Sequence, residues 1–420
     1  MTLNRIRKMY GVMLSLSLLA AWVIGSYFRQ DVSALLVFHG DDSHCDRATE
    51  AIGVHCFGDF ASIGTEKINS PPNGAEAVYP VSSRLFRYPF TIFETVFSYR
   101  TSVFVFLSVL AFAALFPLLH QLRKRNISTS DIAILGICTT PFFATLDRGN
   151  LVGFTSAFLY LYIRAVQRSQ YSRALVFLAL MVAIKPQLAV FIVLLFLIRA
   201  YKVATIGIIL SVSTVVLPYT VFGTKMVVFF KAWITAAREW STSQLPTARY
   251  PSNLSILTFG DIFGNSKVFQ YLIICTTAGY LSYAFVRSAG DKQSASHMVE
   301  DASFVIALGL ILASPISYPY YLVIMFPALA LAIERYQNSV HAESGYRNVE
   351  RVRSVALVIL MVPLVIPNSL GVGVPTSNQT LYNIYPLVQS GALLIALLAF
   401  ITLKTFGKTD NCGTGLRRKC

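Results

Sequence analysis

The sequence predicts an all-α polytopic membrane protein with about twelve transmembrane or re-entrant helices and a long first outer loop. Three observations support this prediction. The chain of 420 residues is 55% hydrophobic and only 13% charged, whereas soluble domains are about 25% charged. Its apolar residues are gathered in runs, several of which approach the roughly 20 residues that cross a bilayer. Its 35 Lys and Arg residues exceed its 20 Asp and Glu residues, which gives a formal net charge of +15, and they lie mainly in short loops between these runs.

The basic charge indicates membrane topology and contact with lipid headgroups rather than binding to nucleic acid. A nucleic-acid-binding chain is expected to carry a basic arm or a basic patch interleaved with aromatic residues, and this sequence has neither. We therefore expect membrane lipids among the partners and no nucleic acid.

The apolar runs predict the helices in order along the chain. The first run, 9–28, follows a basic start as in a signal peptide, but it is long and precedes a poor cleavage site, so we expect an uncleaved span. The others lie at about 101–119, 131–146, 151–163, 174–184, 186–198, 203–222, 268–286, 302–316, 318–333, 354–367 and 386–403. The runs that begin at 151, 174 and 186 are too short for full spans, so we expect broken or re-entrant helices there.

Alternation of these segments places two sets of loops on opposite sides of the membrane. One set carries most of the 35 Lys and Arg residues and should be cytoplasmic. It consists of the N-terminus, 121–130, 164–173, 199–202, 287–300, 334–353 and the C-terminal tail. We expect a multi-pass domain over 1–405 in the inner (cytoplasmic) membrane, a basic cytoplasmic tail over 406–420, and both termini inside.

The most unusual polar residues are predicted on the extracytoplasmic side. The segment DRGN covers 147–150 and the segment AIKPQ covers 183–187. Asp147, Arg148 and Lys185 lie among apolar runs, where an unpaired charge costs about 2.5 to 3.5 kcal/mol at a helix centre. Such residues are expected to line a polar cavity. The simpler alternatives are a Lys185 side chain that reaches the headgroups, an Asp147–Arg148 ion pair in a structural scaffold, and Asn150 as a helix N-cap.

Asp59 is the candidate general base in the first outer loop, 28–100. Most acidic residues of this loop are expected to be solvated, whereas Asp59 is flanked by Phe57 and Phe60. An apolar setting raises the pKa of a carboxylate and suits it to accept a proton from a hydroxyl group.

Two functions from different classes fit these residues. Glycosyl transfer from a lipid phosphate needs a base, cations for the departing phosphate and a groove in the membrane. Asp59 could be the base, and Arg148 and Lys185 the cations. Candidate partners of the sugar hydroxyls are Asn150, Gln187, Asn253 and Ser255. The alternative is a transporter or flippase, which also uses broken helices with charges at depth, although no internal repeat is evident.

The sequence predicts no metal site and no other cofactor. Asp41 and Asp42 are adjacent carboxylates without further spaced ligands, which is a poor arrangement for a divalent cation. Cys45 and Cys56 lie in one outer loop and could pair in an oxidising compartment, a question that the sequence leaves open.

Six short segments, taken in order, resemble the polytopic GT-C glycosyltransferases of glycosyltransferase family 87, whose characterised members are polyprenyl-phosphate-mannose-dependent α-mannosyltransferases. These segments are GDF (58–60), Tyr79-Pro80, RGN (148–150), AIKPQ (183–187), PSNLSI (251–256) and SPISYPYY (314–321). None is specific alone, and their order and common side carry the resemblance.

The resemblance implies the GT-C fold and a specific reaction at the outer face. Asp59 would be the catalytic base, the donor a polyprenyl-phosphate-linked hexose such as mannose, and the acceptor a glycolipid or polysaccharide. The reaction would invert the anomeric carbon, and Lys185 would contact the donor phosphate. Asn253 and Ser255 could equally cap the helix that follows them.

Two departures from the family pattern affect the candidate site. The turn at 314–321 has no His, so its role would rest on Tyr318 or Tyr320, as hydrogen-bond donors or as stacking partners of a sugar. Pro186 directly follows Lys185 and kinks the chain there, which affects the direction of the ammonium group.

Overall fold

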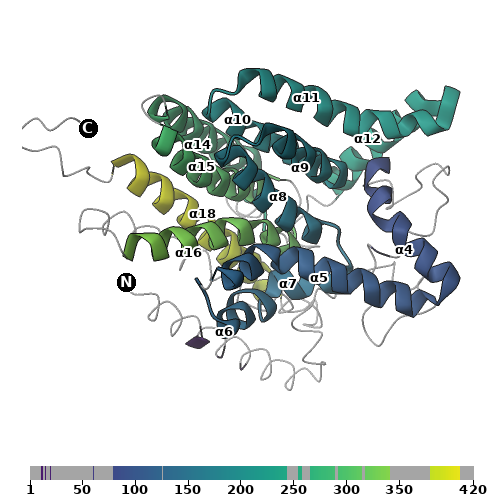
Figure 1. Cartoon of the computed structure of the whole chain (residues 1–420), viewed down its shortest axis with the longest axis horizontal. Helices are drawn as coiled ribbons and strands as arrows, with labels where there is room; N and C mark the ends of the chain where they lie inside the picture. The colour runs from purple at the N-terminus through teal and green to yellow at the C-terminus, as the bar shows by residue number, and fades with distance from the viewer. Residues whose placement is uncertain are drawn as a thin grey trace, which may run out of the picture.

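The chain folds into a bundle of helices, shown by a computed structural model (Figure 1). The structure describes four residues between 11 and 19, then residues 60, 79–124, 126–243, 254–257, 265–288, 292–314, 317–340 and 379–406. Every regular element in these ranges is a helix, as expected for the all-α class. The elements are η3 (Val81–Ser83), α4 (Arg84–Val96), α5 (Tyr99–Arg123), α6 (Thr129–Ile132), η4 (Ala133–Ile137), α7 (Thr140–Arg148), α8 (Val152–Gln167), α9 (Tyr171–Ile184), η5 (Pro186–Ile192), α10 (Val193–Leu197), α11 (Tyr201–Val216), η6 (Leu217–Lys225), α12 (Met226–Ser243), α14 (Ser266–Arg287), α15 (Lys292–Ala313), η8 (Pro319–Met325), α16 (Phe326–Val340) and α18 (Gln379–Phe406).

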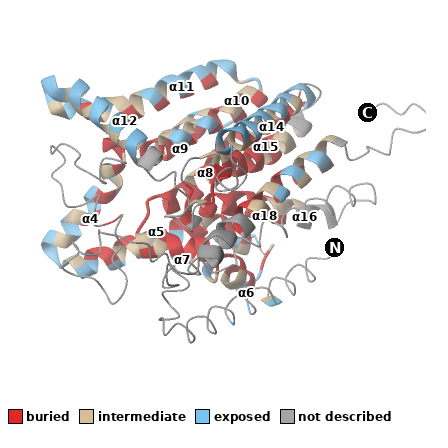
Figure 2. Cartoon of the chain, turned by 180° about the vertical axis from the view of Figure 1, so that it is seen from behind, coloured by how far each residue is buried: buried red, intermediate tan, exposed pale blue. Residues whose placement is uncertain are grey.

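Helix α8 forms the centre of the bundle. It is apolar on all sides, a pattern typical of a helix surrounded by other helices, and most of its residues are buried (Figure 2). It packs against α5, α9, α16 and η8. Close contact with α5 occurs at Gly153, where a Cβ atom would lie 2.7 Å from Leu110 Cδ1 and 2.8 Å from Thr145 Cγ2. The small residue therefore sets the distance between these helices.

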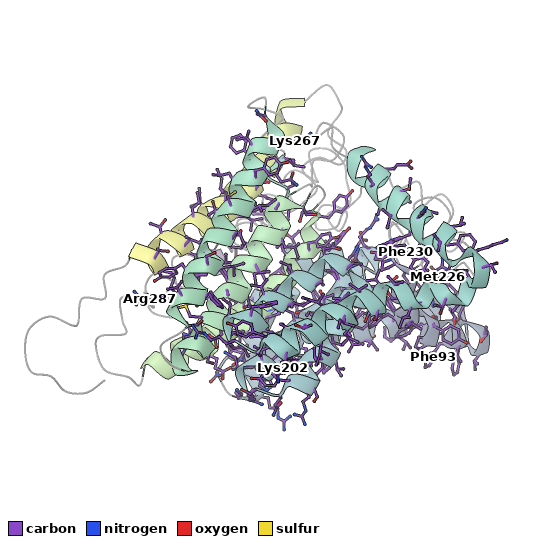
Figure 3. All side chains as sticks on the ribbon, turned by 90° about the horizontal axis from the view of Figure 1, so that it is seen from above. Phe93, Lys202, Met226, Phe230, Lys267 and Arg287 are labelled. Atoms are coloured by element: carbon purple, nitrogen blue, oxygen red, sulfur yellow. The ribbon has the colours of Figure 1, made fainter. Side chains whose placement is uncertain are left out.

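The outer helices expose apolar side chains, as expected of surfaces that face lipid. Ile206, Ile209 and Val212 of α11 and Val286 of α14 are exposed, and both helices are largely exposed in Figure 2. In Figure 3 the α14 ribbon extends between Lys267 and Arg287, which place a basic residue near each end of an apolar helix. This pattern indicates a span with its ends at the headgroups.

Within the described residues, four helices are long and apolar enough to cross a membrane. They are Tyr99–Arg123, Tyr201–Glu239, Lys267–Arg287 and Ser296–Ala313, and a fifth candidate is the pair Thr129–Ile137 and Thr140–Arg148, bent by 64°. Tyr171–Ile184 and Pro186–Leu197 are shorter apolar helices separated by Lys185, as the short runs predict. The count of twelve segments stays a prediction, since the runs at 9–28 and 354–367 lie mostly or wholly outside the described residues.

The part of the first outer loop that the structure describes forms η3 and α4. Phe90 of α4 is buried toward the bundle, whereas Leu85, Ile92 and Val96 are exposed. Helix α4 is joined to α5 by the hydrogen bond from Ser102 Oγ to the Phe90 carbonyl at 2.6 Å. Its outward apolar face is consistent with the predicted interfacial character of this segment.

A charged cluster joins five helices at one end of the bundle. Glu334 of α16 binds Lys124, the residue directly after α5, at 2.9 Å and also binds Arg164 of α8. Arg335 binds Glu300 of α15 at 2.7 Å. Asp301 completes the cluster with contacts of 3.3 Å to Arg335 and 2.8 Å to Lys404 of α18. These residues flank the loops that the charge count assigns to one side, so the structure gathers them as expected. The compartment that this end faces stays a prediction.

The DRGN turn lies at the other end of α8. The helix has 16 residues, so its ends are about 24 Å apart at 1.5 Å per residue. Arg164 of the charged cluster lies in its last turn, and Asn150 lies just before its first residue. The candidate site described below is therefore separated from the charged cluster by the length of this helix.

Candidate functional site

The DRGN segment forms the sharp turn between α7 and α8. Helix α7 ends at Arg148, and Gly149 follows in the left-handed conformation with φ 62° and ψ 34°, which glycine adopts without the steric cost of a side chain. Asp147 is buried and Arg148 is half-buried in the last turn of α7. Asn150 is fully buried, so the turn is an inward-facing part of the bundle.

Asn150 connects this turn to the segment before α4. Its side-chain carbonyl accepts a hydrogen bond from the Val152 backbone N–H at 2.9 Å, and its amide group donates to the Tyr79 hydroxyl at 2.8 Å. The first bond satisfies the N–H of Val152, the first residue of α8, whereas the N-cap position of this helix is Leu151, which makes no side-chain capping bond. The second draws Tyr79 across to the turn, although 71 residues separate the two in sequence.

Lys185 lies at a break between α9 and η5. Proline removes a backbone donor and disfavours helical geometry in the residue before it, so α9 ends at Ile184 and Lys185 is extended, with φ −140° and ψ 102°. The Ser82 hydroxyl donates to the Ala183 carbonyl at 2.8 Å, one of the carbonyls that a helix end leaves without a donor. Residues 79–83 are thereby fixed beside the break.

The Lys185 side chain is 7% exposed and faces two aromatic rings. Its Nζ lies 4.2 Å from the ring centroid of Tyr79 and 5.5 Å from that of Tyr321. Among the described residues no carboxylate forms an ion pair with it. Aromatic faces attract a cation, yet they neutralise it less than a carboxylate does, so the site keeps positive character.

Tyr321 belongs to a group of three tyrosines at the start of η8. The ring centroids of Tyr318 and Tyr320 are 5.5 Å apart, and those of Tyr320 and Tyr321 are 5.1 Å apart with stacked planes. Tyr318 precedes Pro319 and is extended, with φ −83° and ψ 160°, as expected for a residue before a proline. The tyrosines therefore lie at a helix start that contacts both α7 and α8.

Residues 254–256 of the PSNLSI segment bond to the backbone at Leu312 and Ser317. The Leu254 N–H donates to the Ser317 carbonyl at 2.6 Å, and the Ile256 N–H donates to the Leu312 carbonyl at 2.9 Å. The Ser255 hydroxyl is buried, donates to the Leu312 carbonyl at 3.3 Å and accepts from the Leu257 N–H at 3.2 Å. These contacts give Ser255 a backbone-bonding role.

Phe60 packs directly on the DRGN turn. It is fully buried and its ring lies 4.5 Å from the ring of Phe106. A Cβ atom at Gly149 would lie 2.8 Å from Phe60 Cβ, so the glycine is needed for this close approach as well as for its conformation. Asp59, the preceding residue in sequence, lies outside the described residues.

Arg87 of α4 also contacts Phe60. Its guanidinium carbon lies 3.6 Å from the Phe60 ring centroid, its Nε donates to the Phe60 carbonyl at 3.4 Å, and its Nη2 binds Glu94 at 2.9 Å. Burial lowers the pKa of Arg87 from its usual value, while the hydrogen bond and the charge of Glu94 oppose that shift. An arginine remains protonated throughout the accessible pH range.

The structure assembles some of the predicted residues and leaves others apart. Asn150 and Lys185 both contact Tyr79, and Lys185 contacts Tyr321 beside Tyr320. Gln187 is exposed on η5. Asn253, Cys45 and Cys56 lie outside the described residues, as Asp59 does, so their predicted roles stay predictions.

Three residues that complete the arrangement were not among the predicted site residues, namely Tyr79, Arg87 and Tyr321. Tyr79 was noticed only as part of a Tyr-Pro pair. Arg87 lies in the apolar stretch RLFRYPF, and an ionisable residue in such a setting was the signal that identified Lys185. The same signal could therefore have identified Arg87.

The geometry suits an anionic group next to a ring-shaped polar group. Lys185 supplies a buried positive charge, and the tyrosines supply aromatic faces and hydroxyl groups. Asn150 donates a hydrogen bond to Tyr79, the tyrosine whose ring lies closest to the Lys185 ammonium. In the part of the chain that the structure describes, no group of three or more His, Cys, Asp or Glu side chains is placed to hold a metal ion.

Comparison with known proteins gives one match. The model for glycosyltransferase family 87 matches residues 77–315, a range that begins just before Tyr79 and includes the DRGN turn, Lys185 and the PSNLSI segment. No curated protein and no solved structure matches the chain.

Proposed function

Since the chain belongs to glycosyltransferase family 87, we propose that it transfers a hexose, namely mannose, from a polyprenyl-phosphate carrier to a glycolipid or polysaccharide acceptor. Family membership makes the protein a glycosyltransferase with a sugar donor and an acceptor. The carrier, the sugar and the acceptor are our proposal. The observation that supports it most is Lys185, a buried cation beside aromatic rings within the matched region.

Lys185 is suited to bind the phosphate of the donor. A buried charge is costly unless it is paired, and no described carboxylate pairs with this ammonium. A donor phosphate would supply the missing negative charge. As the bond between sugar and phosphate breaks, charge develops on the departing phosphate, so a fixed cation stabilises the transition state more than the ground state.

The tyrosines beside Lys185 are suited to bind the sugar. Tyr320 and Tyr321 present stacked rings, and Tyr321 also contacts the lysine, so a sugar attached to the phosphate would lie within reach of these rings. Tyrosine combines an apolar face with a hydroxyl group, which matches the apolar faces and hydroxyl groups of a hexose. Arg148 and Asn150 complete the candidate binding residues on the DRGN turn, with Asp147 beside them.

Asp59 is proposed as the general base. An acceptor hydroxyl attacks the anomeric carbon of the donor sugar, its proton passes to the Asp59 carboxylate, and the bond from the anomeric carbon to the phosphate oxygen breaks. Polyprenyl phosphate leaves, and attack opposite to it inverts the anomeric configuration. The adjacent residue, Phe60, is buried against Gly149 of the DRGN turn, which supports a role for this part of the loop at the site.

The site is proposed to face the extracytoplasmic side of the inner membrane. The charged cluster lies among loops rich in Lys and Arg, whereas the candidate site lies at the opposite end of α8. Because Lys and Arg are enriched in cytoplasmic loops, the charged cluster should face the cytoplasm and the candidate site the other compartment. Both termini would then be cytoplasmic.

The substitution Asp59→Asn tests the proposed base. It removes proton acceptance but keeps the size of the side chain, so turnover should fall at least about 100-fold, while donor binding stays close to that of the wild type. Asp46→Asn, the same change in the same outer loop, serves as the matched control and should leave turnover unchanged. Wild-type turnover in the Asp59→Asn variant would exclude Asp59 as the base.

A further inference from the structure

Ser82 of η3 bonds to the end of helix α9 that precedes Lys185. Its hydroxyl group donates to the Ala183 carbonyl at 2.8 Å, although the two residues are 101 positions apart. Both residues are buried, a setting in which a hydrogen bond is stronger than in water. The bond therefore ties η3 to the last turn of α9, close to the lysine that is proposed to bind the donor phosphate.

The same short segment also contacts the side chain of this lysine. Tyr79, three residues before Ser82, has its ring centroid 4.2 Å from Lys185 Nζ. The turn between the two is closed by the Ser83 N–H, which donates to the Pro80 carbonyl at 2.9 Å, and the proline ring restricts the backbone further. One compact segment thus contacts both the backbone before Lys185 and the ammonium group.

The other side of the break has its own attachment to the bundle. Tyr162 of α8 donates to the Phe191 carbonyl of η5 at 2.9 Å, and the Leu188 N–H donates to the Lys185 carbonyl at 2.9 Å. These bonds do not involve η3. Loss of the Ser82 hydroxyl group should therefore release the end of α9 while η5 stays attached to α8.

Lys185 depends on such support because its side chain has no fixed direction of its own. A lysine ammonium is a point charge on a flexible four-carbon chain, and its attraction to the rings of Tyr79 and Tyr321 is less directional than a hydrogen bond. A charge stabilises a transition state most when it is held in place beforehand. A displacement of about 1 Å can lower the rate by about 100-fold.

We propose that Ser82 is a positioning residue for transfer: by tying η3 to the end of α9, it holds the Lys185 ammonium beside the Tyr79 ring, where the donor phosphate binds. This proposal rests on the proposed function, because it assigns the phosphate to Lys185. The Ser82 hydroxyl group itself touches neither the phosphate nor the sugar in this account. Its effect on the rate should therefore depend on the presence of the Lys185 charge.

A double-mutant cycle tests this dependence. The wild type, Ser82→Ala, Lys185→Met and the double variant are compared in initial rates with a polyprenyl-phosphate-mannose donor and in thermal unfolding. Ser82→Ala alone should lower kcat/KM about 10-fold. In the Lys185→Met background the same substitution should change kcat/KM by less than about twofold, because no charge is left to position. A contribution to stability alone would lower the rate by the same factor in both backgrounds.

Ser83→Ala is the matched control. Ser83 is the adjacent residue and is also buried, but its hydroxyl group donates to the Pro80 carbonyl at 2.8 Å and not to α9. That carbonyl also accepts from the Ser83 N–H, so it keeps a donor after the substitution. The kinetics of Ser83→Ala should stay within about twofold of the wild type.

Two results would overturn the role of Ser82, namely a wild-type kcat/KM for Ser82→Ala and equal losses in the two backgrounds. The single variants separate this proposal from the proposed function. If Lys185→Met is impaired while Ser82→Ala is not, the phosphate role stands and the role of Ser82 is wrong. If Lys185→Met has wild-type kinetics, the phosphate role fails, and the role of Ser82 fails with it.

Discussion

Replacement of Lys185 by methionine tests the proposed phosphate site. Methionine has a similar length and fills the same space, but it carries no charge. The wild-type ammonium lies 4.2 Å and 5.5 Å from the centroids of two tyrosine rings, and Lys185 as a residue is 7% exposed. The substitution therefore removes the charge that the donor phosphate is proposed to bind and changes little else.

The expected loss follows from the energy of a charged hydrogen bond. Such a bond contributes about 1.5 to 3 kcal/mol, and about 1.4 kcal/mol corresponds to a tenfold change in rate or affinity. The kcat/KM for the donor should therefore fall about 10- to 150-fold. The variant also loses cation–π attraction of up to about 2 kcal/mol but no longer buries a charge. These effects oppose each other, so Tm should change little.

The assay measures initial rates against donor concentration for the wild type, Lys185→Met and the control Lys202→Met. Lys202 is exposed near the start of α11, and its replacement should leave the kinetics unchanged. A kcat/KM for Lys185→Met within about threefold of the wild-type value would refute the phosphate role. The alternative of a lysine that merely reaches the headgroups would then account for its position.

Substitutions at three further residues test the surrounding structure. Gly149→Ala should lower the stability by about 2 to 4 kcal/mol, because alanine is strained in the left-handed conformation and its Cβ would crowd Phe60. The loss should be seen as a lower Tm and lower turnover, and an unchanged Tm would contradict this packing. Tyr79→Phe removes the hydroxyl group that accepts from Asn150 but keeps the ring beside Lys185, whereas Tyr79→Ala removes both. Tyr79→Phe should therefore lower kcat/KM less than Tyr79→Ala does, and equal losses would assign the effect to the hydroxyl group. Glu334→Gln should cost about 1.5 to 3 kcal/mol and lower Tm, with kcat per folded molecule unchanged; a selective loss of kcat would contradict its structural role.

The sequence predicted the helical class and the positions of the breaks because these depend on local chemistry. A proline disfavours helical geometry in the residue before it, as at Lys185 before Pro186, and a glycine after a polar turn is a typical helix end. Lys185 was noticed because a charge in an apolar run is costly. These properties can be read without knowledge of distant residues.

The contacts between distant segments could not be read in the same way. The Asn150–Tyr79 bond joins residues 71 positions apart, and Phe60 meets Gly149 across a similar stretch of chain. Neither pairing follows from periodicity or spacing. Lys185 was expected near a phosphate, yet its two tyrosine neighbours became evident only from the packing of η3 and η8 beside the break.

Counting Lys and Arg residues predicted which loops lie together, but it did not distinguish the buried Arg87 from exposed charges. It grouped the loops whose flanking residues form the charged cluster, since topology depends on total Lys and Arg content. However, the same counting treated Arg87 as one more charge of an outer loop. Burial distinguishes it from its solvated neighbours, and burial depends on the tertiary structure.

The central claim is that the protein transfers sugar from a polyprenyl-phosphate carrier, and an assay with a panel of such donors tests it most directly. Purified protein in nanodiscs is incubated with polyprenyl-phosphate monosaccharides and an acceptor-containing membrane extract, and free polyprenyl phosphate is measured by mass spectrometry. We predict release with the mannose donor by the wild type and its loss in Asp59→Asn. Absence of release with every donor, together with movement of a lipid-linked substrate across proteoliposomes, would contradict the claim and favour a flippase.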